Sequence, residues 1–241
     1  MEETEYPTLD FGSEVKETFT HIIALGEKAN SKLSRLRADL GDKFEHDMLT
    51  IEEGSKYVRF LVAIVDESAS FNELRTSYSH LLSKETILCI IDIAERPSVE
   101  KWSKSESYLW IPSEGQYDNV KNLLEGFQSN VIHHGLLCFD FNDWRWCIKG
   151  RNMVKSYVLR GTEESVFKLL PKWQFDTSPS VFLFFIGIPK CKRLSEKQMI
   201  DVNTNVFKKL RDDAYLHWNI FEREDSNNEI SFTLLQFMPI D

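Results

Sequence analysis

Residues 118–145 read DNVKNLLEGFQSNVIHHGLLCFDFNDWR, and this stretch decides the fold. Within 118–132 the apolar side chains recur at intervals of three and four, the spacing of one face of an α-helix. They are Val120, Leu123, Leu124, Phe127 and Val131. The turn-like sequence PSEGQ precedes this segment, and Gly135 follows it. We therefore expect an amphipathic helix over 118–132, set between two halves of different character.

Before this helix, apolar runs of strand length alternate with helical patterns. The runs lie at 18–26, 57–65, 86–93 and 108–111. Helical spacing appears between them, at 30–40 and at 71–82. Nearly continuous apolar strands that alternate with helices are typical of a parallel sheet covered on both faces. The sequence predicts an α/β fold with a Rossmann-like first half.

The second half is expected to form a smaller α+β domain with a mixed sheet. Short helices are predicted at 142–149 and 162–170, and a buried strand at 181–188. Ser195 and Gln198 have the spacing of a capping box, which satisfies free backbone N–H groups at the start of a helix.

The last two apolar segments are predicted to pair as a hairpin. Residues 216–221 and 229–237 flank the turn-rich sequence DSNN at 225–228. In the second segment the bulky residues Ile230, Phe232 and Leu234 recur at every other position, so one face is expected to be mainly buried.

Composition and charge exclude several classes of function. The 241 residues carry a formal net charge of −9, and no run of Lys or Arg offsets it. Such a surface repels a phosphate backbone, so nucleic acid is not an expected partner. The longest apolar run, Val181–Ile186, is too short to cross a bilayer, and the acidic start MEETEYPTLDFGSE lacks the core of a signal peptide. We expect a soluble, cytoplasmic protein without a transmembrane segment.

The cysteines and the acidic pair Asp66–Glu67 do not predict a metal centre. No CxxC motif and no Cys/His zinc-finger spacing occurs among Cys89, Cys138, Cys147 and Cys191. Three of these thiols lie in apolar or aromatic surroundings, which is typical of buried cysteines in a reducing compartment. The acidic pair is more typical of a solvated turn. We expect no metal and no cofactor.

Residues Gly135–Arg145, GLLCFDFNDWR, resemble the FtsZ stretch GL-x-N-x-DFADVR, which follows the central helix of that family. Asp140 and Asp143 match its acidic positions and Arg145 its arginine, whereas Cys138 replaces its asparagine. The layout of the chain is similar to that of the FtsZ/tubulin family from about Thr18 onward. The resemblance implies an FtsZ/tubulin-type fold. It also implies a synergy loop, which in FtsZ enters the neighbouring subunit's nucleotide site and helps to hydrolyse its GTP.

The glycine-rich loops that hold the nucleotide in this family have no equivalent here. The first has become Gly26-Glu27-Lys-Ala-Asn30, and the second has become Asp66-Glu67-Ser68-Ala-Ser70. A phosphate cradle needs glycine, because its backbone must adopt positive φ and approach the anion closely. Two carboxylates near phosphate oxygens would each oppose binding by about 1–4 kcal/mol. The resemblance therefore implies a degenerate nucleotide site.

The resemblance also divides the chain into parts. It implies an N-terminal segment, 1–17, which we expect to be mobile, and a degenerate GTPase-like domain, 18–117. A central helix, 118–134, and a domain similar to the C-terminal domain of FtsZ, 135–241, follow.

Asp140 and Asp143 also have a purely structural interpretation. Asp140 or Asn142 caps the helix that begins there, and Asp143 favours the positive end of that helix. Trp144 and Trp146 are two residues apart in this predicted helix and point to different faces, so we expect at least one of them to be exposed.

These patterns together predict a non-hydrolysing FtsZ/tubulin-like protein that acts through protein contacts. Its role would be that of a cap, regulator or scaffold of a filament or of a membrane-remodelling apparatus. The expected partner is an FtsZ-type protein or a second copy of this chain. Two alternatives stay open. One is a divergent GTPase that completes a neighbour's site through Asp140 and Asp143, and the other is a module that binds a small molecule in the crevice at the strand ends.

Overall fold

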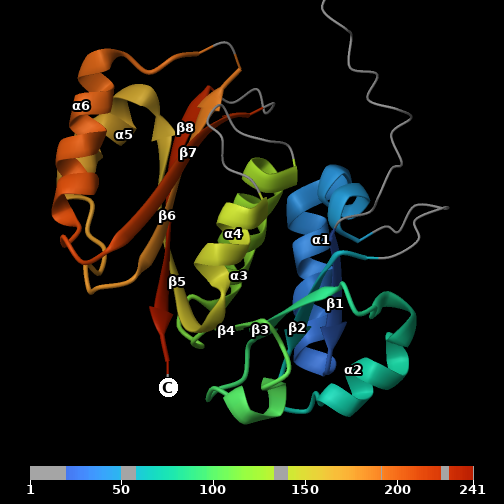
Figure 1. The fold of residues 1–241 in the computed structure, drawn as a ribbon. Coiled ribbons are helices and arrows are strands. Elements are labelled where there is room, and N and C mark those ends of the chain that lie inside the picture. Colours follow the sequence, from blue (N-terminus) through green and yellow to red (C-terminus); the bar gives the residue numbers. More distant parts are fainter. Residues whose placement is uncertain (1–19, 50–57, 133–140, 191, 224–227, 241) are drawn as a thin grey trace, which may run out of the picture.

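The computed structural model describes residues 20–49, 58–132, 141–190, 192–223 and 228–240. The segment 1–17, for which mobility is expected, lies outside these residues. One mixed eight-stranded sheet runs through the molecule in the order β1-β2-β3-β4-β5-β8-β6-β7 (Figure 1). Its strands are β1 (Thr20–Leu25), β2 (Phe60–Val65), β3 (Ile87–Asp92), β4 (Ser107–Trp110), β5 (Gly150–Thr162), β6 (Val181–Pro189), β7 (Tyr215–Arg223) and β8 (Glu229–Pro239).

In the described part of the chain, six α-helices cover this sheet. They are α1 (Glu27–Met48), α2 (Phe71–Ser77), α3 (Gln116–Phe127), α4 (Phe141–Ile148), α5 (Glu163–Leu169) and α6 (Glu196–Asn205). The expected central helix is confirmed as α3, which continues into one π-helical segment, Gln128–Ile132. The capping box is confirmed too, since Ser195 and Gln198 bond reciprocally at the start of α6.

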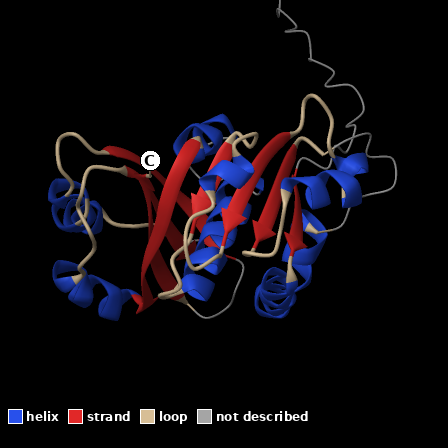
Figure 2. Cartoon of the chain, turned by 90° about the horizontal axis from the view of Figure 1, so that it is seen from below, coloured by secondary structure: helices blue, strands red, loops and turns tan. Residues whose placement is uncertain are grey.

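Three hydrophobic clusters show how the helices bury the sheet. The largest lies beneath α1, α3 and α4 and runs across the sheet from Ile22 in β1 to Phe185 in β6. On the opposite face, α2 covers a second cluster over β1–β4, and α5 and α6 cover a third over β5–β8. Figure 2 shows helices on both sides of the sheet. This is the predicted α/β class.

The joining strand β5 is absent from the sequence prediction. It pairs with β4 in parallel, from Ser107 opposite Gly150 to Trp110 opposite Met153. Its other edge pairs along its full length with β8. The two halves of the chain therefore share one sheet and one continuous core.

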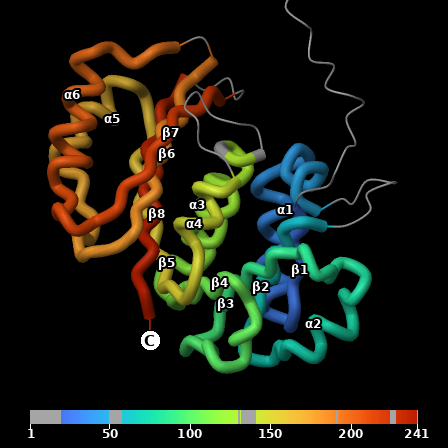
Figure 3. Tube along the Cα trace, viewed as in Figure 1, coloured from blue at the N-terminus to red at the C-terminus, as the bar shows by residue number. Residues whose placement is uncertain are grey.

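The predicted closing hairpin is wrong. β7 pairs in parallel with β6, and β8 lies between β5 and β6, antiparallel to both (red in Figure 3). β8 is buried on both faces, with Leu234 and Leu235 each inaccessible to solvent. A central position suits such a strand, because its two apolar faces cannot both be covered at an edge beside β7.

Candidate functional site

The loops at the carboxyl ends of β1 and β2 meet at one edge of the sheet. Parallel strands bring their carboxyl ends together, and open α/β sheets bind ligands there. Gly26 follows β1 and begins α1, and Asp66–Ser70 follow β2 and lead into α2. The structure therefore brings together the two segments that the sequence marks as degenerate nucleotide loops.

Asp66 places its carboxylate against the N-terminus of α1. Its Oδ2 accepts hydrogen bonds from the backbone N–H groups of Lys28 (2.9 Å) and Ala29 (3.3 Å). Its Oδ1 accepts from the N–H (2.9 Å) and the hydroxyl (2.6 Å) of Ser68. The side chain is buried, with 4% of Asp66 exposed. The free N–H groups at a helix start attract anions, and here the chain supplies the anion itself.

Gly26 permits this close approach. Its φ is +95°, and a Cβ placed on it would lie 2.0 Å from Oδ1 of Asp66. Asn30 fixes the same turn by donating a hydrogen bond of 2.7 Å to the carbonyl of Gly26. The single glycine left in this loop thus makes room for a carboxylate from the neighbouring loop.

Burial and hydrogen bonding act in opposite directions on Asp66. Burial alone raises the pKa of its carboxyl group, because desolvation disfavours the charged form. The four donors from Ser68, Ala29 and Lys28 outweigh burial and hold the pKa below its ordinary value. Asp66 is therefore a buried carboxylate at neutral pH.

Glu67 and Ser70, in the loop after β2, also have internal partners. Glu67 forms an ion pair with Lys28, and the ammonium of Lys101 donates to the carbonyl of Glu67 (2.9 Å). The hydroxyl of Ser70 accepts from the N–H of Glu73 (3.2 Å) and caps α2. Glu27 lies exposed in the first turn of α1.

A second buried carboxylate, Asp92 at the end of β3, escaped the sequence analysis. Its Oδ1 accepts from the N–H of Ala94 (2.8 Å), and its Oδ2 accepts from the N–H of Ser98 (3.2 Å) and the hydroxyl of Tyr108 (2.5 Å). Burial and the nearby Asp92 carboxylate raise the pKa of Tyr108. The sequence signal was available, since an acid that ends a fully apolar strand needs partners.

Side chains from β4 and α3 tie down the same loop. The indole N–H of Trp110 donates to the carbonyl of Ala94 (3.0 Å). The amide of Gln116 donates to the carbonyls of Ile93 and Ile111, both at 2.9 Å. The loops after β3 and β4 are thus bonded to one another through these side chains.

The motif that suggested an interaction surface lies on α4. Asp140 is outside the described residues, and Asp143 is half-buried in the first turn of the helix. Arg145 grips Glu106 with two hydrogen bonds, at 2.5 and 2.9 Å, which fixes α4 to the start of β4. As expected, the two tryptophans face opposite ways, with Trp144 3% exposed and Trp146 49% exposed.

Two solved structures have a fold similar to that of this chain over most of their length. An FtsZ dimer from M. jannaschii superposes with a TM-score of 0.51, at 12% identity over 90% of this chain and 88% of that one. CetZ from Methanosaeta thermophila gives 0.54, at 9% identity over 91% of this chain and 87% of that one. The chain has the FtsZ/tubulin fold. No protein-family model matches the sequence, and no curated protein is similar to it in sequence.

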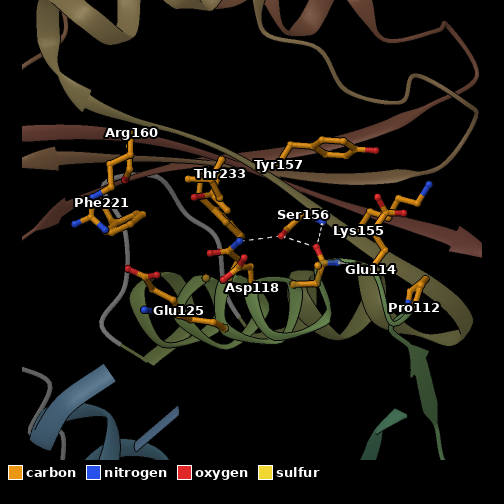
Figure 4. A pocket seen from close by; sticks show the side chains of 18 of the residues that line it. Pro112, Glu114, Asp118, Glu125, Lys155, Ser156, Tyr157, Arg160, Phe221 and Thr233 are labelled. Atoms are coloured by element: carbon orange, nitrogen blue, oxygen red, sulfur yellow. Dashed lines mark hydrogen bonds between the residues drawn. The ribbon is translucent and has the colours of Figure 1, made fainter. Parts of the chain in front are cut away.

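This FtsZ/tubulin fold contains a cleft that the sequence analysis did not foresee. About 690 Å³ lie between α3 and the strands β5, β8, β6 and β7 (Figure 4). Ser156 on β5, at the floor of the cleft, bonds to Asn119 on α3, which forms its wall. Both the N–H and the hydroxyl of Ser156 donate to Oδ1 of Asn119, each at 2.7 Å. Asn122 donates to the same hydroxyl at 2.8 Å. The sequence patterns did not predict β5, which supplies the floor of the cleft, and so they did not predict the cleft.

Among the described residues, no helix is long and apolar enough to span a membrane. Nor do three or more His, Cys, Asp or Glu side chains gather around one point in that part of the chain, as a metal ion would require.

Proposed function

We propose that this chain is a non-hydrolysing protein of FtsZ/tubulin fold that acts in the cytoplasm through protein contacts, as a cap, regulator or scaffold of a filament or membrane-remodelling apparatus. The observation that carries the proposal is the carboxylate of Asp66 on the N–H groups of Lys28 and Ala29. A nucleotide phosphate at this edge would need the same donors.

The cost of displacing Asp66 opposes nucleotide binding. A phosphate that takes its place removes the donors that keep a buried carboxylate charged. If the carboxylate stays nearby, each pair of like charges costs about 1–4 kcal/mol at moderate effective dielectric. Both outcomes disfavour GTP, so the proposed role does not depend on hydrolysis by this chain.

The proposed contact face is the start of α4. Asp143 lies in the first turn of this helix and Asp140 precedes the helix in the sequence, while Arg145 positions the helix through Glu106. Burial raises the pKa of the Cys147 thiol to about 12, and the negative charge of Asp143, one helical turn earlier, contributes to this rise. A partner that binds a nucleotide would meet negative charge here.

Polymerisation of an FtsZ-type protein tests this proposal. We expect substoichiometric amounts of the chain to lower the light scattering of growing filaments, because a cap with a closed crevice offers no surface for the next subunit. The double variant Asp140→Ala/Asp143→Ala should lose the effect. A matched control, Glu164→Ala/Glu196→Ala on the exposed surfaces of α5 and α6, should keep it.

The same assay separates the alternatives. Unchanged scattering at every ratio, or inhibition that survives loss of both aspartates, contradicts the proposed contact. Faster GTP hydrolysis by the partner, without capping, would support the alternative in which Asp140 and Asp143 complete a neighbour's site.

The cleft beside α3 favours a second candidate function, binding of a small polar molecule. Its volume of about 690 Å³ is in the range of ligand pockets, and its lining carries charges of both signs, including Asp118, Glu125, Lys155 and Arg160. Thr233→Trp would fill the floor. Saturation-transfer NMR signals from polar fragments that vanish in this variant would support binding there, and signals that persist would oppose it.

A further inference from the structure

Two exposed rings, Trp146 and Tyr215, and the half-buried ring of His217 form a group that we name the aromatic patch. The ring of Trp146 lies 5.5 Å from that of Tyr215 and 5.4 Å from that of His217, measured between centroids. Trp146 is 49% exposed and Tyr215 63% exposed. The patch joins α4 to β7, two elements far apart in the sequence. Exposed Trp and Tyr rings that touch one another are typical of protein interfaces.

The patch is held in place by its neighbours. Arg145 is fixed by Glu106, and Cys147 on the other side of Trp146 is buried in the core beneath α4. Trp146 therefore has a rigid backbone, and its ring is restrained by the rings from β7. Little side-chain entropy remains to be lost when a partner binds.

Other aromatic rings in this chain already have a cation above them. The guanidinium of Arg35 lies 3.8 Å from the ring centre of Tyr117, and the ammonium of Lys104 lies 5.4 Å from that of Phe71. Among the described residues no Lys or Arg side chain takes this position over Trp146 or Tyr215. Tryptophan is the ring to which a cation binds best, so the patch offers a cation site that no Lys or Arg of the described segments fills.

The charges along α4 and before β7 favour a cation from outside. Asp143 precedes Trp146 by three residues, the spacing of neighbours on one helix face. Two arginines close in sequence to the patch form ion pairs, Arg145 with Glu106 and Arg211 with Asp213 (3.1 Å). Lys149, just after the helix, is exposed. The whole chain is acidic, with a net charge of −9, which attracts a basic partner at long range.

We propose that the aromatic patch docks a basic segment of a partner protein, with an arginine or lysine side chain stacked on Trp146 beside Asp143. This inference deepens the proposed function, since it rests on a contact role and names the chemistry of the partner. Arginine suits the site best, because its planar guanidinium is always charged and stacks on an aromatic ring.

A peptide titration followed by NMR tests the inference on the whole chain. The probe is a blocked peptide of alternating Gly and Arg, compared with a peptide in which uncharged citrulline replaces each Arg. We expect the Arg peptide to shift the indole N–H signal of Trp146 and the citrulline peptide to leave it in place. Trp146→Ala should weaken binding about tenfold. Ile200→Ala, which removes an equally exposed apolar side chain from α6, should not.

Several other results would overturn the inference. No shift with the Arg peptide, equal shifts with both peptides, or unchanged affinity in Trp146→Ala would exclude cation docking on this ring. A dimer in sedimentation that dissociates in Trp146→Ala would assign the patch to contact between copies. Filament capping that persists while the Arg peptide fails to bind would contradict the inference and leave the proposed function standing. Peptide binding without capping would support the inference and contradict the proposed function.

Discussion

The crevice edge and the α4 face both carry aspartates, yet they use them in opposite ways. Asp66 and Asp92 are buried, and every carboxylate oxygen of the pair accepts at least one hydrogen bond. Asp143 is only half-buried, one helical turn before an exposed tryptophan. Buried carboxylates with complete partners hold loops together, whereas acids beside exposed rings are suited to contact. We infer that the functional surface of this molecule has moved from the crevice to α4.

The largest expected effect comes from removing the carboxylate at the crevice edge. Asp66→Ala leaves the N–H groups of Lys28 and Ala29 without their acceptor in a buried position. We expect a loss of roughly 2–4 kcal/mol in the free energy of unfolding, measured by urea denaturation. Glu67→Ala, at the next and exposed position, is the matched control and should change stability little. Equal losses of stability in Asp66→Ala and Glu67→Ala would contradict the claim that the buried carboxylate holds the crevice edge together.

A smaller loss in the free energy of unfolding is expected at the loop after β3. Tyr108→Phe removes one of the donors to buried Asp92 and keeps the ring. We expect a cost of about 1–3 kcal/mol in thermal or urea unfolding. Tyr117→Phe deletes a hydroxyl that bonds to Asp39 at the surface, and it should cost much less. A Tyr108 variant as stable as the wild type would show that the crevice loops are not held as we describe.

The pH dependence of stability is a finer test of the same edge. Because the native pKa of Asp66 is lowered, the unfolded chain binds the proton first as the pH falls. The stabilisation is complete above the unfolded pKa of about 4 and is lost as the pH falls through the native pKa. The stability gap between wild type and Asp66→Asn, followed by urea denaturation from pH 7 to pH 3, should therefore narrow. A constant gap would mean that the charge of Asp66 contributes nothing.

The crevice also shows where sequence reasoning stops. Two acids in place of a glycine loop predict that phosphate is disfavoured, and this stays a prediction. The sequence does not show that Asp66 itself takes the position at the helix start, because its partner Lys28 is 38 residues away. Local patterns do not report contacts at such separation.

The strands were predictable where both faces are apolar and not where each face mixes polar and apolar residues. β2, FLVAIV, is buried at every position and was found from its composition. Along β5, Ser156 shares one face with Val154, and Lys155 shares the other with Tyr157, so its sequence lacks the alternation that marks a half-buried strand. The wrong hairpin has a similar origin. The turn signal between β7 and β8 is local, whereas the place of β8 is decided by the need to bury both of its faces.

Calorimetric titration of GTP and GDP into the chain, with Mg²⁺ present, tests the central claim most directly. That claim is that Asp66 occupies the anion position at the start of α1 and closes the nucleotide site. We expect no heat of binding at micromolar concentrations of either nucleotide. A dissociation constant below about 10 μM, equivalent to roughly 7 kcal/mol, would show that a nucleotide displaces the carboxylate and would contradict the claim.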